Sequence, residues 1–384
     1  MAERIKKTVA LLALLTCALI YWSAPRPLHG QSQTQATTSF SGWRPTREFQ
    51  GVGYVGSSVC TQCHKSQSQN FFATPMAHAL EKVSDCDLLI KHPRLRFKEG
   101  PFSYQITRQG NRSIYTVSDG TQSISEPLLY CFGKGEAGQT YVFEHNGSLY
   151  EGRASFFREL RNLNITILHP RSVPKSLEDA LGRRMSQEGA RGCFNCHSTA
   201  AVSRSQLQLD HLVPGVTCEA CHGPGEKHLA AVKAKNFNDL QIFNPRTLDS
   251  FDLTQEFCGA CHMSFEQAMA MPDHGGINNL RFQPYRIFKS RAHFVNDPRM
   301  SCTACHNPHD NLQHEAAFYD SKCLACHLSG SQEAKTETRT ASACPVARQL
   351  CVTCHMPKVE VPEMRFKFTD HWIRVVKPGE SVPR

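Results

Sequence analysis

Seven copies of one short cysteine–histidine motif stand out in this 384-residue chain. In each copy a Cys-x-x-Cys pair is followed directly by histidine. Two thiols at this spacing can form thioether bonds to the two vinyl groups of a porphyrin, and the adjacent imidazole can bind the iron from below. The sequence therefore predicts seven covalently attached haem c groups, at motifs 1 to 7: Cys60–Cys63–His64, Cys193–Cys196–His197, Cys218–Cys221–His222, Cys258–Cys261–His262, Cys302–Cys305–His306, Cys323–Cys326–His327 and Cys351–Cys354–His355.

Zinc and thiol redox chemistry are the alternatives for such cysteine pairs. Structural zinc sites reach four ligands by pairing two knuckles, which an odd number of motifs does not allow, and zinc gives no reason for a histidine after every pair. Thioredoxin-like proteins carry one Cys-x-x-Cys per domain. Haem attachment explains all seven copies together.

Each iron also requires a sixth ligand unless a substrate binds there. After residue 30, eleven histidines lie outside the motifs, more than the seven that full coordination needs. This surplus favours haems with two axial histidines. From the sequence alone, His169, His211 and His293 are candidate distal ligands, whereas we expect His92, His145, His274 and His314 to be surface residues or propionate contacts.

Two kinds of local sequence surround the motifs. From residue 193 onward the motifs follow one another closely, which leaves room for short helices and loops around the haems. Between motifs 1 and 2, polar and apolar residues alternate in five strand-like runs that begin at Phe102, Ser113, Pro127, Thr140 and Ser148. We therefore expect a mainly α multihaem cytochrome fold with much loop, built around its haems, with an antiparallel β-rich insertion between haems 1 and 2.

Several strings resemble the cytochrome c-554-like multihaem cytochromes, which have the cytochrome c-552/4 domain. The resemblance covers residues 51–82 and about 190–375. It departs from the small tetrahaem members in having seven motifs and the β-rich insertion. The strings are Val55–His64, Gly215–Gly225 with His228 after it, Cys302–His309, and Cys351–Lys358 leading to His371.

The resemblance implies electron transfer between haems that mostly have two axial histidines. It also implies particular distal ligands. His78 matches the distal histidine on the helix after the first motif, and His228, His309 and His371 occupy matching positions after motifs 3, 5 and 7. Whether any haem is catalytic stays open.

The N-terminus has the pattern of an export signal. Three basic residues precede an apolar run from Thr8 to about Trp22. We expect residues 1–30 to be a cleaved signal peptide or an uncleaved N-terminal anchor, and the protein to be periplasmic. The expected divisions are then a linker at 31–50, a haem 1 segment at 51–94, the β-rich insertion at 95–165 and a multihaem domain at 166–384.

The net charge of +9 does not indicate nucleic-acid binding. Removal of residues 1–30, with four basic residues and one acidic residue, leaves about +6. Seven ferric haems with ionised propionates would bring this to about −1. We therefore expect the basic residues to balance propionates, and the partners to be periplasmic or membrane-bound redox proteins, with no nucleic acid and with membrane contact only through a possible N-terminal anchor.

Two functions remain open at this stage. The first is an exported heptahaem c-type cytochrome that transfers electrons along its haems. The second is a multihaem oxidoreductase that acts on a small nitrogen or sulfur compound, such as hydroxylamine or nitrite, at one five-coordinate haem. Haems 1 and 4 are the candidates for that role because no obvious distal histidine closely follows their motifs.

Two other patterns are discounted or left open. Gly133–Gly138 matches a dinucleotide-binding fingerprint, but the chain continues as a strand, so we expect a loop. Cys86 and Cys131 lie outside the motifs and could form a disulfide or remain buried thiols.

Overall fold

The computed structural model describes residues 40, 42–49, 53–290, 297–327, 344–377 and 379–380. The expected export signal at 1–30, most of the expected linker, and His293 lie outside the described residues. Within the described part of the chain, no helix has both the length and the apolar character needed to cross a membrane.

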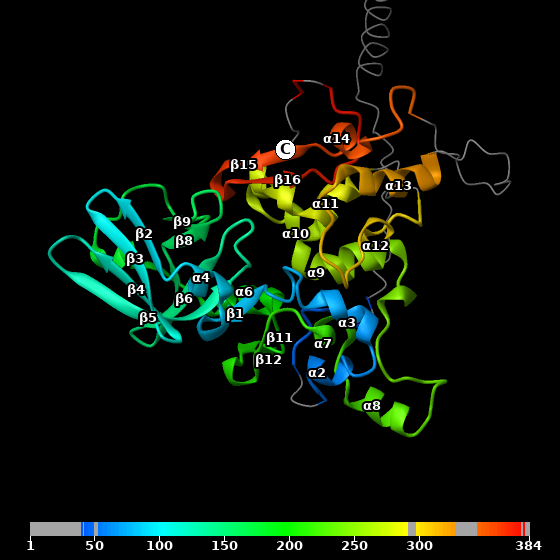
Figure 1. The fold of residues 1–384 in the computed structure, drawn as a ribbon, viewed down its shortest axis with the longest axis horizontal. Coiled ribbons are helices and arrows are strands. Elements are labelled where there is room, and N and C mark those ends of the chain that lie inside the picture. Colours follow the sequence, from blue (N-terminus) through cyan, green and yellow to red (C-terminus); the bar gives the residue numbers. More distant parts are fainter. Residues whose placement is uncertain are drawn as a thin grey trace, which may run out of the picture. The chain divides into compact units, whose positions relative to one another are not determined.

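One antiparallel sheet of eight strands dominates the first half of the described chain (Figure 1). Seven strands follow the order β10-β7-β6-β5-β4-β3-β2. Strand β1 pairs with residues 130–132 of β5, beyond the end of the pairing between β5 and β4. The strands are β1 (Leu80–Lys82), β2 (Arg94–Glu99), β3 (Phe102–Gln109), β4 (Arg112–Ser118), β5 (Ser123–Phe132), β6 (Thr140–His145), β7 (Ser148–Gly152) and β10 (Gly182–Arg184).

Alternation of side chains explains why these segments form a sheet. Along β3, the residues Phe102, Tyr104 and Ile106 are buried, while the residues between them are more exposed. Successive strand residues point to opposite faces, so this pattern gives the sheet one apolar face. That face packs into a core with Tyr115, Phe143 and the short helix α5 (Leu177–Leu181).

The expectation of a mainly α fold is wrong. The five strand-like runs form β3 to β7, but the sheet also takes in β1, β2 and β10, and it spans the chain from Leu80 to Arg184. The long interval without a motif has its own apolar core and so forms a large sheet by itself.

Four two-stranded ladders lie outside the large sheet. Their strands are β8 (Ala154–Phe157) with β9 (Asn162–Ile165), β11 (Ser198–Thr199) with β14 (Val213–Pro214), β12 (Val202–Ser203) with β13 (Gln206–Leu207), and β15 (Lys358–Val361) with β16 (Phe366–Thr369). The Gly133–Gly138 segment is the loop between β5 and β6, which confirms that it opens no helix.

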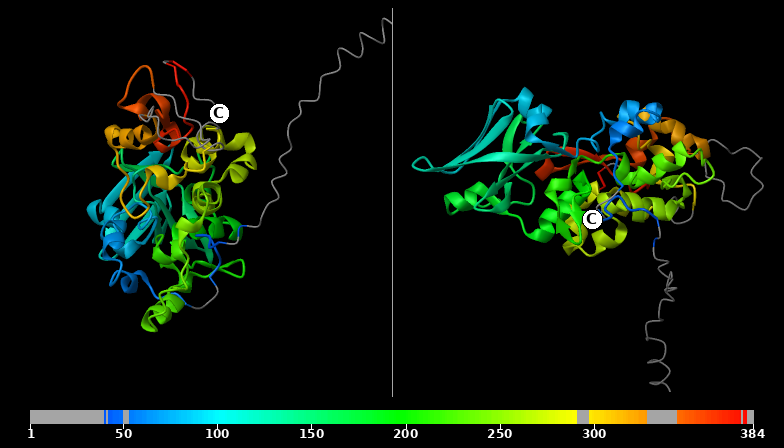
Figure 2. Two further views of the ribbon diagram at one scale, coloured as in Figure 1. Left: turned by 90° about the vertical axis from the view of Figure 1, so that its right-hand side faces the viewer. Right: turned by 90° about the horizontal axis from the view of Figure 1, so that it is seen from below.

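The helices of the described residues are short, the longest having 12 residues. Most of these helices contain a motif or lie near one in the chain. Figure 2 shows the helices of the second half of the chain from two further sides. Besides α5, they are α2 (Ser57–Cys60), α3 (Lys65–Phe71), α4 (Asp87–Lys91), α6 (Gln187–His197), α7 (Cys218–His222), α8 (Glu226–Lys233), α9 (Gly259–His262), α10 (Phe265–Met269), α11 (Gln283–Phe288), α12 (Cys302–Cys305), α13 (Ala316–His327) and α14 (Cys351–His355), with the 3-10 and π segments η1 (Val83–Asp85), η2 (Leu209–His211), η3 (Pro245–Thr247), η4 (Asp252–Cys258), η5 (Pro272–Arg281) and η6 (Pro362–Met364).

The segment 76–79 connects the sheet to the motifs. Ala79 O accepts hydrogen bonds from Gly133 N in the sheet, at 2.8 Å, and from the motif 2 histidine His197, at 2.9 Å. On the other side, Gly215 (φ +73°) approaches the segment so closely that an added Cβ would lie 2.0 Å from Ala77 O. Only glycine fits there, and it leads the chain directly into motif 3.

Candidate haem-binding sites

Every motif lies on or at the end of a helical segment. Motifs 2, 3, 6 and 7 lie on α6, α7, α13 and α14, and motif 4 spans the junction of the π-helix η4 with α9. Motif 5 lies on α12 up to its histidine, and motif 1 begins at the last residue of α2 and continues in the turn that follows. In a helix, residues three and four positions apart share a face. The helical turn therefore brings both cysteines and the histidine of a motif to one side, as attachment to a single porphyrin requires.

Three motif histidines face a second histidine from elsewhere in the chain. The ring centroids of His64 and His228 are 6.2 Å apart, those of His222 and His309 are 6.1 Å apart, and those of His306 and His371 are 6.2 Å apart. The His222 and His309 rings are nearly parallel, at 6°.

This nearly constant spacing fits one metal ion between two imidazoles. Direct stacking of aromatic rings would allow any separation from about 4.5 to 7 Å. Two metal–imidazole bonds of about 2 Å each, plus half the width of each ring, give a centroid separation close to the observed one. Residues of these three motifs therefore fit an iron with two axial histidines.

Hydrogen bonds set the tautomer of several of these rings. Nδ1 of His197, His222 and His355 lies 2.9 to 3.0 Å from a backbone carbonyl oxygen. Nδ1 of the facing histidines His228 and His371 also lies near a carbonyl, at 2.8 and 2.9 Å. A ring that donates from Nδ1 keeps its Nε2 lone pair for a metal.

The three facing pairs follow a regular offset in sequence. His228, which comes after motif 3, faces motif 1; His309, after motif 5, faces motif 3; and His371, after motif 7, faces motif 5. Sequence reasoning selected these three histidines but did not find the offset. Folding places each of these histidines opposite the motif that lies two motifs before the one it follows in the chain.

The other predicted distal ligands have different surroundings. His78 lies 2.6 Å from Glu81 Oε1 and 2.8 Å from Phe72 O, so both its ring nitrogens have protein partners. His169 Nε2 lies 3.1 Å from Glu151 Oε2. The His211 ring packs against Phe49 at 5.2 Å. The structure therefore does not bring these three candidates opposite a motif histidine.

His262 of motif 4 has an unusual environment. Burial among surrounding residues lowers its pKa, and the nearby His197 and His306 add to that effect.

Contacts between motif cysteines show which motifs are neighbours. Thiols close enough to influence each other's pKa join motif 1 to motif 3 (Cys60 and Cys218), motif 2 to motif 4 (Cys196 and Cys261), motif 4 to motif 5 (Cys258 and Cys302) and motif 6 to motif 7 (Cys323 and Cys351). Electrostatic contacts join motif 3 to motif 4 (Cys221 and Cys258) and motif 5 to motif 6 (Cys305 and Cys323). All seven motifs thus form one connected series, with motif 4 next to motifs 2, 3 and 5.

Two carboxylates hold neighbouring motifs together. Glu219, within motif 3 and 3% exposed, accepts hydrogen bonds from the backbone of Val55 and Gly56 beside motif 1, both at 2.8 Å, and from Gly225 at 2.9 Å. Asp320 on α13 accepts from Leu350 N and Cys351 N, at 2.7 and 2.9 Å, at the start of α14. These bonds, chiefly that from Cys351, lower the pKa of Asp320.

A buried charged cluster lies next to His371. Arg286 and Asp370 are fully buried, and two hydrogen bonds of 2.8 Å join the guanidinium to the two carboxylate oxygens. Arg374 Nη1 donates to the same carboxylate at 2.7 Å. Burial is the largest single effect and raises the pKa of Asp370, but the hydrogen bonds and charge of Arg286, together with hydrogen bonds from Trp372 N and Arg374, leave the pKa lowered. Asp370 is therefore ionised at neutral pH.

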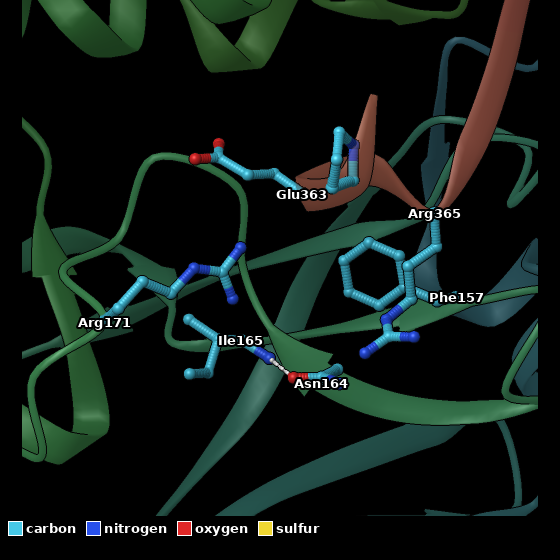
Figure 3. Close-up of a pocket in the computed structure, with 7 residues that line it drawn as sticks. Phe157, Asn164, Ile165, Arg171, Glu363 and Arg365 are labelled. Atoms are coloured by element: carbon cyan, nitrogen blue, oxygen red, sulfur yellow. Dashed lines mark hydrogen bonds between the residues drawn. The ribbon is translucent and has the colours of Figure 1, made fainter. Parts of the chain in front are cut away.

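One cavity of the described residues is separate from the motifs. It has a volume of about 310 Å³ and lies between the β8–β9 hairpin and the turn that joins β15 to β16 (Figure 3). Its lining residues are Phe157, Asn164, Ile165, Arg171, Pro362, Glu363 and Arg365. None of these is a motif cysteine or histidine, so this cavity is not a haem site.

Cys86 and Cys131 are free thiols in the core of the sheet. Both are fully buried, and Cys86 Sγ donates to Gln139 Oε1 at 3.2 Å. A hydrogen bond with Cys131 is the largest cause of the lowered pKa of Cys86. The structure thus has the buried-thiol alternative, not the disulfide.

Comparison with known proteins gives two similarities. The sequence profile described as "Cytochrome c554 and c-prime" matches residues 167–223, which include motifs 2 and 3. The multiheme cytochrome MtrA of Shewanella baltica (strain OS185) is 22% identical over 212 residues, which are 48% of this chain and 60% of that protein. The aligned region thus spans well under two thirds of the relative's length. No solved structure matches the chain.

The site geometry and both similarities lead to one assignment. The motifs provide thiol pairs and imidazoles for covalent haem c, the matching profile describes cytochromes c554 and c-prime, and the similar protein is named a multiheme cytochrome. Haem iron bound in this way supplies one-electron chemistry. The chain thus resembles multihaem c-type cytochromes, and both similarities imply that it binds haem c covalently.

Proposed function

We propose that the chain carries seven haem c groups and transfers electrons along them, with two axial histidines at haems 1, 3 and 5. The single observation that carries this proposal is the facing of His64 with His228, His222 with His309 and His306 with His371, all at nearly one spacing. Low-spin irons with two histidine ligands exchange electrons without binding substrate.

The order of motif contacts supports a branched arrangement. Motif 4 has motifs 2, 3 and 5 as neighbours, motif 1 adjoins motif 3, and motifs 5, 6 and 7 follow in sequence. Haems 1, 2 and 7 then lie at the ends of the array. Those ends are where we propose that redox partners exchange electrons with the protein.

Export remains part of the proposal. Haem c attachment takes place outside the cytoplasm, and residues 1–30 have the pattern of a signal peptide or N-terminal anchor. We propose a periplasmic protein whose partners are periplasmic or membrane-bound redox proteins. The division into a haem 1 segment at 51–94, a β-rich insertion at 95–165 and a multihaem domain at 166–384 is kept as a working division.

The alternative is catalysis at one five-coordinate haem. Sequence reasoning named haems 1 and 4 for this role. The facing of His64 with His228 argues against haem 1. Haem 4 stays a candidate because no obvious distal histidine closely follows its motif in the sequence.

One experiment separates the two functions. Holoprotein is produced in a host that attaches haem c, its mass gives the number of haems, and EPR of the oxidised protein gives their spin states. Optical spectra are recorded before and after nitrite, hydroxylamine or cyanide. Seven haems, all low-spin and unchanged by these ligands, are the result expected for an electron carrier. A high-spin ferric signal that shifts with a ligand would favour the enzyme.

A further inference from the structure

Three cationic side chains surround the indole ring of Trp372. The Lys289 ammonium lies 4.6 Å from the ring centroid, and the guanidinium carbons of Arg374 and Arg286 lie 4.7 and 5.5 Å from it. Asp370 is the carboxylate that both arginines bind. Burying several like charges together is costly unless anions balance them.

Arg374 has buried donors that nothing in the described structure satisfies. Its Nη1 binds Asp370 and Trp372 O, at 2.7 and 3.1 Å. Its Nε and Nη2 are buried and have no hydrogen-bond partner. An arginine presents its donors as a planar fork that matches a carboxylate. The two unused donors are thus suited to an anionic oxygen ligand.

The backbone of Arg374 is tied to a motif histidine. Arg374 N donates to His355 O at 3.3 Å, and His355 Nδ1 lies 3.0 Å from Arg374 O. His355 belongs to motif 7. Three residues before Arg374, His371 faces the motif 5 histidine His306. The backbone of Arg374 therefore contacts the histidine of motif 7, and Arg374 lies three residues after the histidine that faces motif 5.

We propose that Arg374, with Lys289 beside it, is a binding site for a propionate carboxylate of the haem at motif 5 or motif 7. The inference rests on the proposed attachment of haem at those two motifs. It also gives the cluster a function beyond packing. A fixed cation beside a haem favours the reduced form, which carries one more negative charge. Arg374 is thus a positioning residue that raises the reduction potential of one haem.

The test compares wild-type holoprotein with Arg374→Gln and Arg374→Lys. Arg158→Gln is the matched control, because Arg158 is an exposed arginine of the sheet region paired with Glu136. Haem content is measured first, and each resolved low-spin EPR signal is then followed through a redox titration. In Arg374→Gln we expect the equilibrium constant for reducing one haem to fall on the order of tenfold. The fall is smaller in Arg374→Lys and absent in Arg158→Gln.

Three results of this experiment would contradict the inference. Seven unchanged reduction curves in Arg374→Gln, with all haems present, would reject it and leave the proposed electron transfer intact. A sulfate-dependent potential in the wild type that Arg374→Gln abolishes, without any shift in sulfate-free buffer, would assign the donors to a soluble anion instead. If wild-type protein has no haem at motifs 5 and 7, the proposed function and this inference both fail.

A second variant, Lys289→Gln, provides the test if Arg374→Gln does not attach its haems. Lys289 is suitable because it contributes a charge beside the same indole ring. We expect a smaller shift of the same haem in the same direction. An unchanged titration of Lys289→Gln would then reject the inference.

Discussion

The sheet and the motif region each contain a buried cluster of arginine and carboxylate side chains. The two clusters differ in how many of the arginine N–H donors have a hydrogen-bond partner. In the sheet, Arg153 binds Glu99 through Nε and Nη2, at 2.7 and 2.8 Å, and Nη2 also donates to Pro170 O and Ser172 O. Among the motifs, Arg286 and Asp370 are equally well paired, but Arg374 beside them keeps two buried donors without a partner. The buried guanidinium of the sheet thus has its anionic partner within the fold, whereas Arg374 has two donors left for a further anionic group.

The apolar cores of the two regions differ in the same way. The main core cluster of the sheet region has eighteen buried residues, among them Tyr104, Tyr115 and Phe143. The clusters that the structure describes around η5, α10 and the C-terminal hairpin have three buried residues each. Burial of apolar surface is the main stabilising contribution to folding. The motif region therefore depends on its haems for most of its core.

Haem removal should produce the largest effect. A chain in which every motif cysteine is changed to serine cannot attach haem, and we expect its motif region to unfold while the sheet persists. Limited proteolysis followed by mass spectrometry should give a resistant fragment close to residues 80–184. Uniform digestion, or equal protection of both regions, would contradict this expectation. Wild-type holoprotein digested in parallel is the control.

Breaking the buried pair of the sheet should have the next largest effect. Arg153→Met leaves the Glu99 carboxylate buried without its partner, which costs about 3–5 kcal/mol of unfolding free energy. Urea unfolding followed by far-ultraviolet circular dichroism measures this loss. The haem spectrum should stay that of the wild type. Arg158→Met, at an exposed ion pair, is the control and should cost at most about 1 kcal/mol. A spectrum altered in Arg153→Met would show that the two regions are not independent.

A smaller effect is expected where a carboxylate joins two motifs. Glu219→Gln removes the charge that accepts three backbone hydrogen bonds, which costs about 1–3 kcal/mol. The loss should appear locally, as faster amide exchange at Val55 and Gly56. Glu226→Gln, an exposed glutamate a few residues further on, is the matched control. Unchanged exchange in Glu219→Gln would mean that the haems alone hold motifs 1 and 3 together.

The smallest expected effect is a pH dependence within the sheet region. The hydrogen bond with Glu126, followed by the charge of Glu178, raises the pKa of His145. A raised folded-state pKa stabilises the fold below the unfolded value of about 6.5, and this contribution is lost as the pH rises through the folded-state pKa. His145→Gln should therefore cost more stability at pH 5.5 than at pH 8.5 in urea unfolding. An equal cost at both pH values would contradict the assignment.

The motifs and the alternating strands could be predicted from local sequence. Cysteine and histidine spacing identifies the haem attachment sites, and the runs from Phe102 to Glu151 form strands β3 to β7. Local patterns could not predict the three-residue strands β1 and β10, because each becomes a strand only by pairing with an existing sheet edge or strand. The sheet is therefore larger than the five alternating runs alone predict.

The axial pairs show a second limit of sequence reasoning. The sequence identifies His228, His309 and His371 as candidates. It does not show that each faces the motif that lies two motifs before the one it follows. His78, which the resemblance favoured equally, instead contacts Glu81 and Phe72. The two unused donors of Arg374 could not be predicted either, because a donor can be recognised as unused only when its neighbours in the fold are known. Pairings at long range depend on the tertiary fold.

The most direct test of the account is the spin state of single histidine variants. His228→Ala, His309→Ala and His371→Ala are prepared as holoprotein, with His78→Ala as the matched control, and their oxidised EPR spectra are compared with the wild type. The account predicts that each of the three variants converts one low-spin haem to high spin, at haem 1, 3 and 5 respectively, while His78→Ala leaves all signals unchanged. Wild-type spectra for the three variants, or a new high-spin signal in His78→Ala, would contradict the axial pairs on which the proposed electron transfer rests.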